Sequence, residues 1–309
     1  MTRVAAVDCG TNSIRLLVAD VDASHLTEID RRLEIVRLGQ GVDKTGRLDP
    51  AALARTFTSC RAYAKEIEQL GVERVRFVAT SASRDAENRS EFVAGIREIL
   101  GVTPEVISGD EEARLSFAGA TRSLRATAAG HPPPYLVVDI GGGSTEFVLG
   151  EDAVHAARSV DIGCVRLTER HLRTNPPTTA QVAAARADIA QAIDQAASAV
   201  PLAHVRTLVG LAGSVTTVAA IALGLDTYDP ARIHHSVISS ADVRRVSDEL
   251  LRMTHQERAA LPVMHPGRVD VIGAGALILA EIVDRVGVDE VVVSEHDILD
   301  GIAWALAGG

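Results

Sequence analysis

The chain has 309 residues, of which 47% are hydrophobic, 3% aromatic and 23% charged, and its formal net charge is −10. This length suggests two domains, and the composition argues against a disordered chain, a collagen-like repeat and a disulfide scaffold. An acidic chain also lacks the broad basic field that binding along nucleic acid requires, so we expect no nucleic-acid partner.

The first part of the chain alternates short apolar runs with amphipathic segments. Apolar runs that end at an acidic residue or a glycine predict buried strands, and segments with a period near 3.6 residues predict helices. The predicted strands are residues 4–8, 14–18, 34–38, 75–79 and 105–107. The predicted helices are residues 50–70, which end before Gly71, then 89–100 and 111–122. A glycine-rich loop is expected at residues 39–46.

Residues 126–134 are small and proline-rich, and they are the best candidate for a linker. Beyond them the predicted strands are residues 135–139, 146–149, 154–160, 207–210 and 290–294. The predicted helices are residues 179–200, capped by Thr178 or Thr179, then 241–253, 267–286 and a final helix from 297. This alternation predicts an α/β fold.

The three cysteines, Cys9, Cys60 and Cys164, are odd in number and widely spaced, without a CxxC pair. This pattern is typical of a reduced, cytoplasmic protein, in which we expect small buried thiols rather than nucleophiles. The first residues do not resemble a signal peptide, and no run of about 18 uninterrupted apolar residues occurs. We therefore expect no membrane partner.

Two strand–turn segments of the chain repeat one pattern. The first runs from Asp8 through Gly10 and Ser13 to Arg15, and the second reads Asp139-Ile140-Gly141-Gly142-Gly143-Ser144-Thr145-Glu146. Both consist of an apolar strand, Asp-x-Gly-x-x-Ser, one further residue, a charged residue and a second apolar strand. The repeat predicts two related halves, each of which has a hairpin turn with an acidic residue at its base.

The chemistry of such a turn suits a phosphate group. Glycines let the backbone approach an anion closely, and successive N–H groups can form an anion-binding nest. The hydroxyls of Ser13 and Ser144 add donors, and Asp8 and Asp139 could hold a hard cation such as Mg²⁺. Two such turns facing each other would hold a magnesium-bound polyphosphate from both sides. Asp-x-Gly turns also end strands without any ligand, so one copy alone would not indicate a site.

Three segments together resemble the exopolyphosphatase/guanosine-pentaphosphate phosphohydrolase (Ppx/GppA) family. They are residues 8–13, residues 108–114 (Ser-Gly-Asp-Glu-Glu-Ala-Arg) and residues 139–146. The resemblance extends to residues 39–48, 163–165, 210–217 and 267–277, and so covers nearly the whole chain. It implies two actin-like, ribonuclease H-like domains around a central cleft, which we place at residues 1–125, joined by the C-terminal helix 297–309, and at 126–296.

The resemblance also implies roles for individual residues. Glu112 matches the general base that activates water, and Arg84 matches a phosphate-binding arginine of the catalytic site. The substrate-binding residues that it implies are Gly10, Thr11, Asn12, Ser13, Gly141, Gly142, Gly143, Ser144, Gly213 and Ser214. The implied metal ligands are Asp8, Asp139 and Glu146, with Mg²⁺ as the cofactor.

Some positions depart from the family pattern. Thr11 and Ser214 stand where serine and threonine are frequent, and Leu299 stands where we expect arginine, so we assign residues 297–301 no ligand role. Long family members have an additional helical region at the C-terminus. Because this sequence stops at Gly309, we expect the short, two-domain form.

Several of these residues also suit purely structural roles. Glu112 lies near the start of a predicted helix, where a carboxylate is favourable through the helix dipole alone. Arg84 could be a solvated loop arginine, and Glu146 could be an exposed strand residue. A polyanionic substrate of an acidic protein requires a local lining of arginines, for which the candidates are Arg84, Arg89, Arg114, Arg166 and Arg268.

Two further classes of site are disfavoured. His234, His235, His265 and His296 lack zinc-ligand spacing with the cysteines, and we expect structural roles for them. No Walker A lysine follows any glycine turn, which excludes a P-loop nucleotidase.

The function that this pattern favours is a Mg²⁺-dependent exopolyphosphatase, which would use Glu112 to activate water and release orthophosphate from inorganic polyphosphate. The first alternative is a phosphohydrolase that acts on guanosine pentaphosphate. A sugar-kinase-like phosphotransferase and a non-catalytic regulator that binds an alarmone or another nucleotide also remain open. A homodimer is expected from the family alone.

Overall fold

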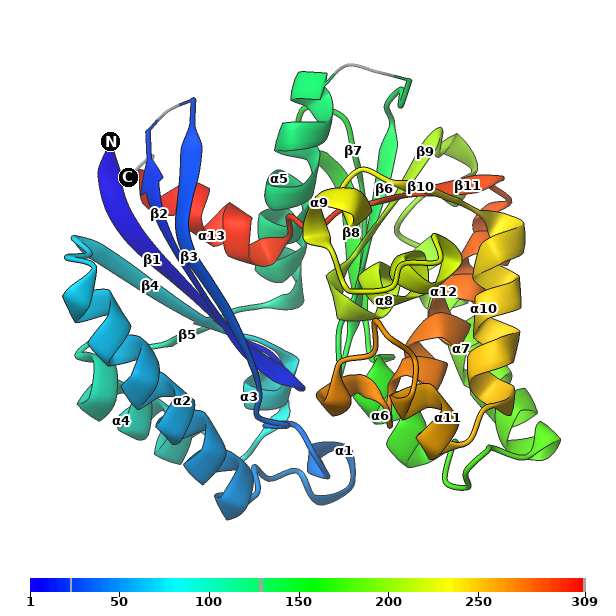
Figure 1. Ribbon diagram of the computed structural model, residues 1–309, viewed down its shortest axis with the longest axis horizontal. Helices are drawn as coiled ribbons and strands as arrows, with labels where there is room; N and C mark the ends of the chain where they lie inside the picture. Colours follow the sequence, from blue (N-terminus) through cyan, green and yellow to red (C-terminus); the bar gives the residue numbers. More distant parts are fainter. Residues whose placement is uncertain (23, 128–129, 308–309) are drawn as a thin grey trace. The chain divides into compact units, whose positions relative to one another are not determined.

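The computed structural model describes residues 1–22, 24–127 and 130–307, and the chain divides into two compact units (Figure 1). The first unit consists of Met1–Gly119 and the segment that begins at Ile298, and the second consists of Ala120–Asp297. The division lies inside helix α5 (Gly109–Thr127), whereas the sequence placed the boundary at residue 126. The predicted linker therefore overlaps the end of α5, and its residues 128 and 129 lie outside the described residues.

The first unit contains a five-stranded sheet with the order β3-β2-β1-β4-β5. Its strands are β1 (Thr2–Cys9), β2 (Ser13–Val21), β3 (Leu26–Ile35), β4 (Arg74–Ala79) and β5 (Glu105–Val106). Pairing is antiparallel from β1 to β2 and from β2 to β3, and parallel from β1 to β4 and from β4 to β5. The carboxyl ends of β1, β4 and β5 therefore lie at the same edge of the sheet.

Helices cover both faces of this sheet, which explains why β1 reads as an unbroken apolar run. The helices of the first unit are α1 (Val42–Thr45), α2 (Pro50–Gln69), α3 (Ser81–Asp85), α4 (Arg89–Leu100), most of α5 and α13 (Ile298–Ala307). Alternate residues of β1 point to opposite faces. Ala5 and Val7 pack in the cluster that α2 and α4 complete, and Val4 and Ala6 pack in the cluster that α13 completes.

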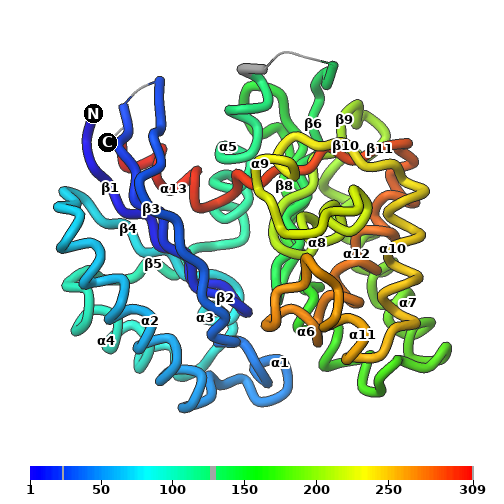
Figure 2. Tube along the Cα trace, viewed as in Figure 1, coloured from blue at the N-terminus to red at the C-terminus, as the bar shows by residue number. Residues whose placement is uncertain are grey.

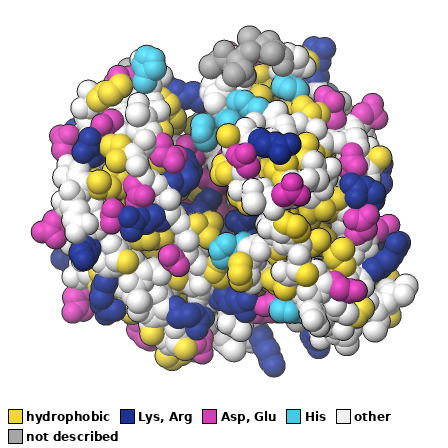
Figure 3. All heavy atoms as spheres, viewed as in Figure 1, with side chains coloured by type: hydrophobic (Ala, Val, Ile, Leu, Met, Phe, Trp, Pro, Cys, Tyr) yellow, Lys and Arg dark blue, Asp and Glu magenta, His cyan; other side chains and the backbone are white. Residues whose placement is uncertain are grey.

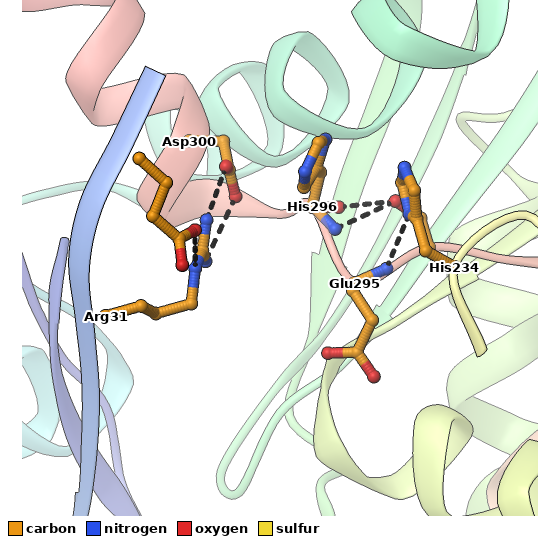
Figure 4. Close-up of polar contacts among 7 residues, drawn as sticks. Arg31, His234, Glu295, His296 and Asp300 are labelled. Atoms are coloured by element: carbon orange, nitrogen blue, oxygen red, sulfur yellow. Dashed lines mark hydrogen bonds and ion pairs between the residues drawn. The ribbon is translucent and has the colours of Figure 1, made fainter. Parts of the chain in front are cut away.

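The C-terminal helix α13 is firmly attached to the first unit. Arg31 of β3 donates to Asp300 Oδ1 at 2.7 Å, and Asp300 is buried (Figure 4). A side chain at Gly301 would overlap the backbone of Leu115, so the glycine permits α13 to pack directly on α5. Figure 2 shows how this last segment of the chain returns to lie along β1.

The second unit contains a six-stranded sheet with the order β10-β11-β9-β6-β7-β8. Its strands are β6 (Tyr135–Ile140), β7 (Thr145–Gly150), β8 (Val154–Val160), β9 (Thr207–Leu211), β10 (Val237–Ser239) and β11 (Glu290–Val293). Its helices are α6 (Cys164–Arg170), α7 (Thr179–Ala197), α8 (Ala212–Ala222), α9 (Pro230–Ile233), α10 (Ser240–Arg252), α11 (His255–Ala259) and α12 (Ile272–Val286), with short 3₁₀ turns η1 (Leu202–His204) and η2 (Pro266–Arg268).

The two sheets share one topology, which gives the sequence repeat a structural meaning. In each unit three antiparallel strands come first along the chain, and two strands parallel to the first of them follow. The second unit adds β10 at the edge, antiparallel to β11. The predicted α/β fold with two related halves is confirmed.

Some predicted elements are wrong in their bounds. The strand expected at residues 34–38 shares only residues 34 and 35 with β3, which runs from Leu26 to Ile35. The many charged residues of this edge strand hide its apolar pattern. The helix expected at 267–286 begins only at Ile272, because residues 266–268 form the separate turn η2. Helices α6 and α8, which follow glycine turns directly, were not predicted as helices at all.

The described part of the chain contains no helix that is both long enough and apolar enough to cross a lipid bilayer. Over the face drawn in Figure 3, acidic and basic side chains are interspersed, without a broad basic area. This distribution agrees with the acidic net charge of the chain.

Candidate active site

We call the turn between β1 and β2, residues 10–13, the first turn. Gly10 N donates to Ser13 O at 2.9 Å and closes it. The segment 36–39 then holds its carbonyls. Gly39 N donates to Thr11 O at 2.8 Å, and the amides of residues 36 and 37 donate to Asn12 O at 3.1 and 2.9 Å. In a trans peptide the N–H points opposite to the C=O, so the amides of Asn12 and Ser13 point away from that segment. Such amides can receive an anion.

Parallel pairing brings two more segments to the first turn. Thr80, just after β4, donates its amide to Cys9 O at 3.2 Å, and Ile107, just after β5, donates to Ala79 O at 3.1 Å. The hydroxyls of Thr11 and Ser81 lie 2.8 Å apart. Helices α3 and α5 therefore both begin at the sheet edge where the first turn lies, as expected for strands whose carboxyl ends meet.

The two predicted catalytic residues are in direct contact at this edge. Arg84 of α3 donates its Nη1 to Glu112 Oε2 at 3.1 Å and to Ile107 O at 3.0 Å. The Glu112 side chain is 10% exposed and that of Arg84 is 26% exposed. Ser108 begins α5 by accepting the amide of Glu111 on its hydroxyl at 3.2 Å, so Glu112 sits in the first helical turn. The helix dipole and Arg84 both favour its charged form.

Asp8, a predicted metal ligand, has a cation beside it. Arg15 stands directly opposite Asp8 in the β1–β2 register, and its Nε and Nη2 donate to Asp8 Oδ2 at 3.0 and 2.6 Å. The side chains are 5% exposed for Asp8 and 18% for Arg15. In the sequence, Arg15 stands out only as the charged position of the repeat. The hairpin register could have identified the pair, because residues on either side of a tight turn face each other.

We call the turn between β6 and β7, residues 141–144, the second turn. Gly141 N donates to Ser144 O at 3.0 Å, which is the same closure as in the first turn. Its carbonyls are held by the beginning of α6. The contacts are Cys164 N to Gly141 O at 3.0 Å, Val165 N and Arg166 N to Gly142 O at 2.9 and 3.1 Å, and Arg166 Nε to Gly143 O at 2.7 Å. The amides of residues 142–144 consequently point away from α6, as a phosphate-binding turn requires.

Two acidic residues stand at the base of the second turn. Asp139 lies directly opposite Glu146 in the β6–β7 register, so both side chains emerge on the same face of the sheet. They are 8% and 1% exposed, and Ser159 of β8 donates its hydroxyl to Glu146 Oε1 at 2.7 Å. The burial of Glu146 argues against the alternative of an exposed strand residue.

The donor set of this pair suits Mg²⁺, which prefers carboxylate oxygens. Within residues 1–22, 24–127 and 130–307, no group of three or more His, Cys, Asp and Glu side chains is arranged to hold a metal ion. Mg²⁺ commonly binds through one or two carboxylates, with phosphate oxygens and water as the other ligands, so a pair is a sufficient protein contribution.

A third turn ends β9 and contains two predicted substrate-binding residues. Helix α8 begins at Ala212, whose φ of 65° is in the left-handed region, and Gly213 and Ser214 form its first turn. Arg268 lies over Gly213 and donates its Nη1 to Gly213 O at 3.2 Å and to Thr217 Oγ1 at 3.1 Å. Because β6 and β9 are parallel neighbours, this turn and the second turn lie at the same sheet edge.

Three of the four histidines singled out in the sequence form a packed cluster. The rings of His234 and His235 stack at 3.8 Å, and those of His234 and His296 lie at 4.3 Å. The amide of Glu295 donates to His234 Nδ1 at 3.2 Å (Figure 4). Burial lowers the pKa of His235, and the nearby His296 and His131 lower it further. These contacts pack the three rings against one another and favour the neutral form of His235.

Comparisons with known proteins show which proteins this chain resembles. The model of the Ppx/GppA phosphatase family matches residues 17–306. Exopolyphosphatase 2 of Mycobacterium tuberculosis is 52% identical, over 100% of this chain and 99% of that protein. The solved PPX-GPPA enzyme of Aquifex aeolicus is 32% identical with a TM-score of 0.81, over 98% and 99% of the two chains. The guanosine-5'-triphosphate,3'-diphosphate pyrophosphatase of Aeromonas salmonicida is 27% identical, over 98% of this chain and 59% of that protein.

Proposed function

This chain belongs to the Ppx/GppA phosphatase family, and on that premise we propose that it is an exopolyphosphatase. It hydrolyses the terminal phosphoanhydride bond of inorganic polyphosphate and releases orthophosphate. The full-length similarity to an exopolyphosphatase supports this substrate. The structural observation that carries the proposal is the buried carboxylate of Glu112 at the sheet edge where the amides of the first turn are turned outward.

In this proposal Glu112 orients the attacking water and accepts its proton. The amides of Asn12 and Ser13 and the guanidinium of Arg84 bind the oxygens of the transferred phosphoryl group and stabilise the charge that they gain in the transition state. Hydrolysis of a phosphoanhydride needs little covalent participation by the protein, so positioning and electrostatics account for the catalysis.

We assign Mg²⁺ to Asp139 and Glu146 rather than to Asp8. The former two carboxylates share one face of the sheet, whereas Asp8 already has the guanidinium of Arg15 as its cationic partner. When bound, the ion neutralises charge on phosphate oxygens. The roles of Gly213 and Ser214 and the expectation that both turns hold one polyphosphate stay predictions.

The test is orthophosphate release from short and long polyphosphate, guanosine pentaphosphate, ATP and ADP, with and without Mg²⁺. Wild type should release orthophosphate from polyphosphate. Glu112→Gln, which preserves size and a hydrogen-bond acceptor for Arg84, should fold normally and lower kcat at least about a hundredfold, because it removes the general base. Circular dichroism is the control for folding. Full activity of Glu112→Gln would remove this residue from the mechanism.

The alternative substrate is guanosine pentaphosphate. It is favoured by the similarity to the Aeromonas salmonicida protein, of which this chain spans 59% of the length. Release of orthophosphate from the guanosine compound alone would make this alternative the function. Binding of guanosine compounds without any release would instead indicate a non-catalytic regulator. A homodimer remains a family-based prediction, which sedimentation would check.

A further inference from the structure

The contact between Arg84 and Glu112 presents a chemical conflict. A general base is most effective when its proton affinity is close to the operating pH, and enzymes raise the proton affinity of a glutamate through burial to reach that range. An arginine at 3.1 Å has the opposite effect, because it stabilises the charged carboxylate. In the substrate-free protein Glu112 is therefore well oriented but only weakly basic.

The guanidinium has donors left for a second partner. Only its Nη1 is used by the described residues, and the same nitrogen serves both Glu112 and Ile107 O. Its Nε and Nη2 donate to no described residue, and arginine binds phosphate best through two parallel donors. Arg84 is also the more exposed member of the pair, with 26% of its side chain accessible against 10% for Glu112.

Helix α3 connects this arginine to the place where phosphate would bind. Arg84 is held by its amide to Thr80 O at 3.0 Å, and Ser81 contacts Thr11 of the first turn at 2.8 Å. An anion bound to the amides of the first turn would therefore lie at the same sheet edge as α3 and Arg84. It would compete with Glu112 for the guanidinium.

We propose that Arg84, besides binding phosphate, gates the base: it keeps Glu112 paired and weakly basic until a phosphoryl group binds and takes over the guanidinium. This inference rests on the proposed function. Released from the cation, the buried carboxylate accepts a proton from water. The water oxygen forms its bond to the terminal phosphorus while the bridging P–O bond breaks, and the shortened chain leaves with the electron pair. The basicity of Glu112 thus rises only when substrate is in place.

The chain contains a matched control. Arg76 of β4 donates its Nη2 to Glu111 Oε1 at 2.7 Å and also binds Glu105. It therefore holds the residue next to Glu112, in the same turn of α5, by the same kind of ion pair. Arg76→Gln removes an arginine that contacts this helical turn without removing the cation that contacts Glu112.

The test compares the acid limbs of two pH profiles for polyphosphate hydrolysis. The limb of kcat/KM reports groups of the free enzyme, and that of kcat reports groups of the enzyme–substrate complex. In wild type the acid limb of kcat should lie at least about one pH unit above the acid limb of kcat/KM, which is the usual effect of losing a cation at this distance. In Arg84→Gln the kcat/KM limb should move up to meet it, since the free enzyme then lacks the cation too. Arg76→Gln should retain the wild-type separation.

The possible outcomes separate the inference from the function. If wild type hydrolyses polyphosphate but its two limbs coincide, the gating is wrong and the proposed function stands. If Arg84→Gln raises only KM and leaves the kcat/KM limb in place, Arg84 binds phosphate alone, and the gating is again wrong. Arg84→Lys keeps the charge and should recover part of the separation, which covers the case of a poorly folded Arg84→Gln. A wild type that releases no orthophosphate from polyphosphate overturns both proposals.

Discussion

The first and second turns have the same backbone design and different electrostatics. Each is closed by an amide-to-carbonyl hydrogen bond from its first glycine to its serine, and in each a neighbouring segment holds the carbonyls so that amides face outward. At the base, however, Asp8 faces Arg15 across the hairpin, whereas Asp139 faces Glu146. The two copies thus share their backbone hydrogen bonding, while one position, Arg15 in the first and Glu146 in the second, gives the base of each turn a different charge.

The difference at this position has opposite energetic consequences. The Asp8–Arg15 pair is nearly neutral, and each charge compensates the other away from water, so removing one partner alone destabilises the first unit. Two carboxylates directly opposite each other on adjacent strands destabilise the second sheet. A cost of this kind is typical of functional sites, and the proposed Mg²⁺ would relieve it.

The largest expected effect comes from the segment that supports the second turn. A Cβ at Gly163 would overlap the backbone of Gly142 and Gly143, which cannot move without disturbing the amides of the turn. We expect Gly163→Ala to lower kcat/KM by at least about a hundredfold, because displaced donors lose their alignment with the transition state. Steady-state kinetics measures this loss, and wild-type kinetics in Gly163→Ala would show that the turn tolerates displacement.

The corresponding support of the first turn should be more tolerant. A Cβ at Gly39 would overlap mainly the methyl group of Thr11, which is a side chain rather than backbone. Gly39→Ala should therefore impair activity, and the double variant with Thr11→Ser, which removes that methyl group, should recover most of it. A double variant no more active than Gly39→Ala would mean that the backbone, not the methyl group, is the obstacle.

Neutralising one charged residue at the foot of each turn should change the free energy of unfolding in opposite directions. Arg15→Gln leaves a buried carboxylate without its guanidinium partner and should lower the free energy of unfolding by about 3 kcal/mol. Glu146→Gln removes a like-charge contact and should leave the free energy of unfolding in chelator unchanged or raise it by up to about 1 kcal/mol. Urea denaturation measures both values, and titration of activity with Mg²⁺ should show weaker binding of the ion only in Glu146→Gln. Equal destabilisation by the two substitutions would contradict the comparison.

The smallest effect concerns the thiols near the two turns. Burial raises the pKa of Cys9 well above its ordinary value, and Cys60 and Asp8 raise it further. Burial also raises the pKa of Cys164, but a hydrogen bond with Ser214 and the charge of Arg268 oppose that rise. We therefore expect iodoacetamide at about pH 8 to alkylate Cys164 several-fold faster than Cys9. Peptide mass spectrometry distinguishes the sites, and faster reaction of Cys9 would contradict this order.

Much of the fold was predictable because its signals are local. The strands at 75–79 and 154–160 and the helix at 89–100 follow from apolar periodicity, and the Thr178 cap was among those expected for the long helix that begins at Thr179. The edge strand β3 was misplaced because half-exposed, charged residues carry little apolar pattern. Helix α8 was missed because its glycine-containing start resembles a turn.

The sequence by itself determined the two hairpin turns, the acidic residue at the base of each and the alternation that builds two related sheets. These features depend on neighbours in the chain, through backbone freedom at glycine and the burial of alternate side chains. Only the tertiary structure decided which arginine meets Glu112, which segments hold the turn carbonyls and that Asp300 joins the last helix to β3. Such contacts link positions far apart in the chain. No local sequence pattern encodes them, because the residues meet only when the folded sheet and its helices bring them together.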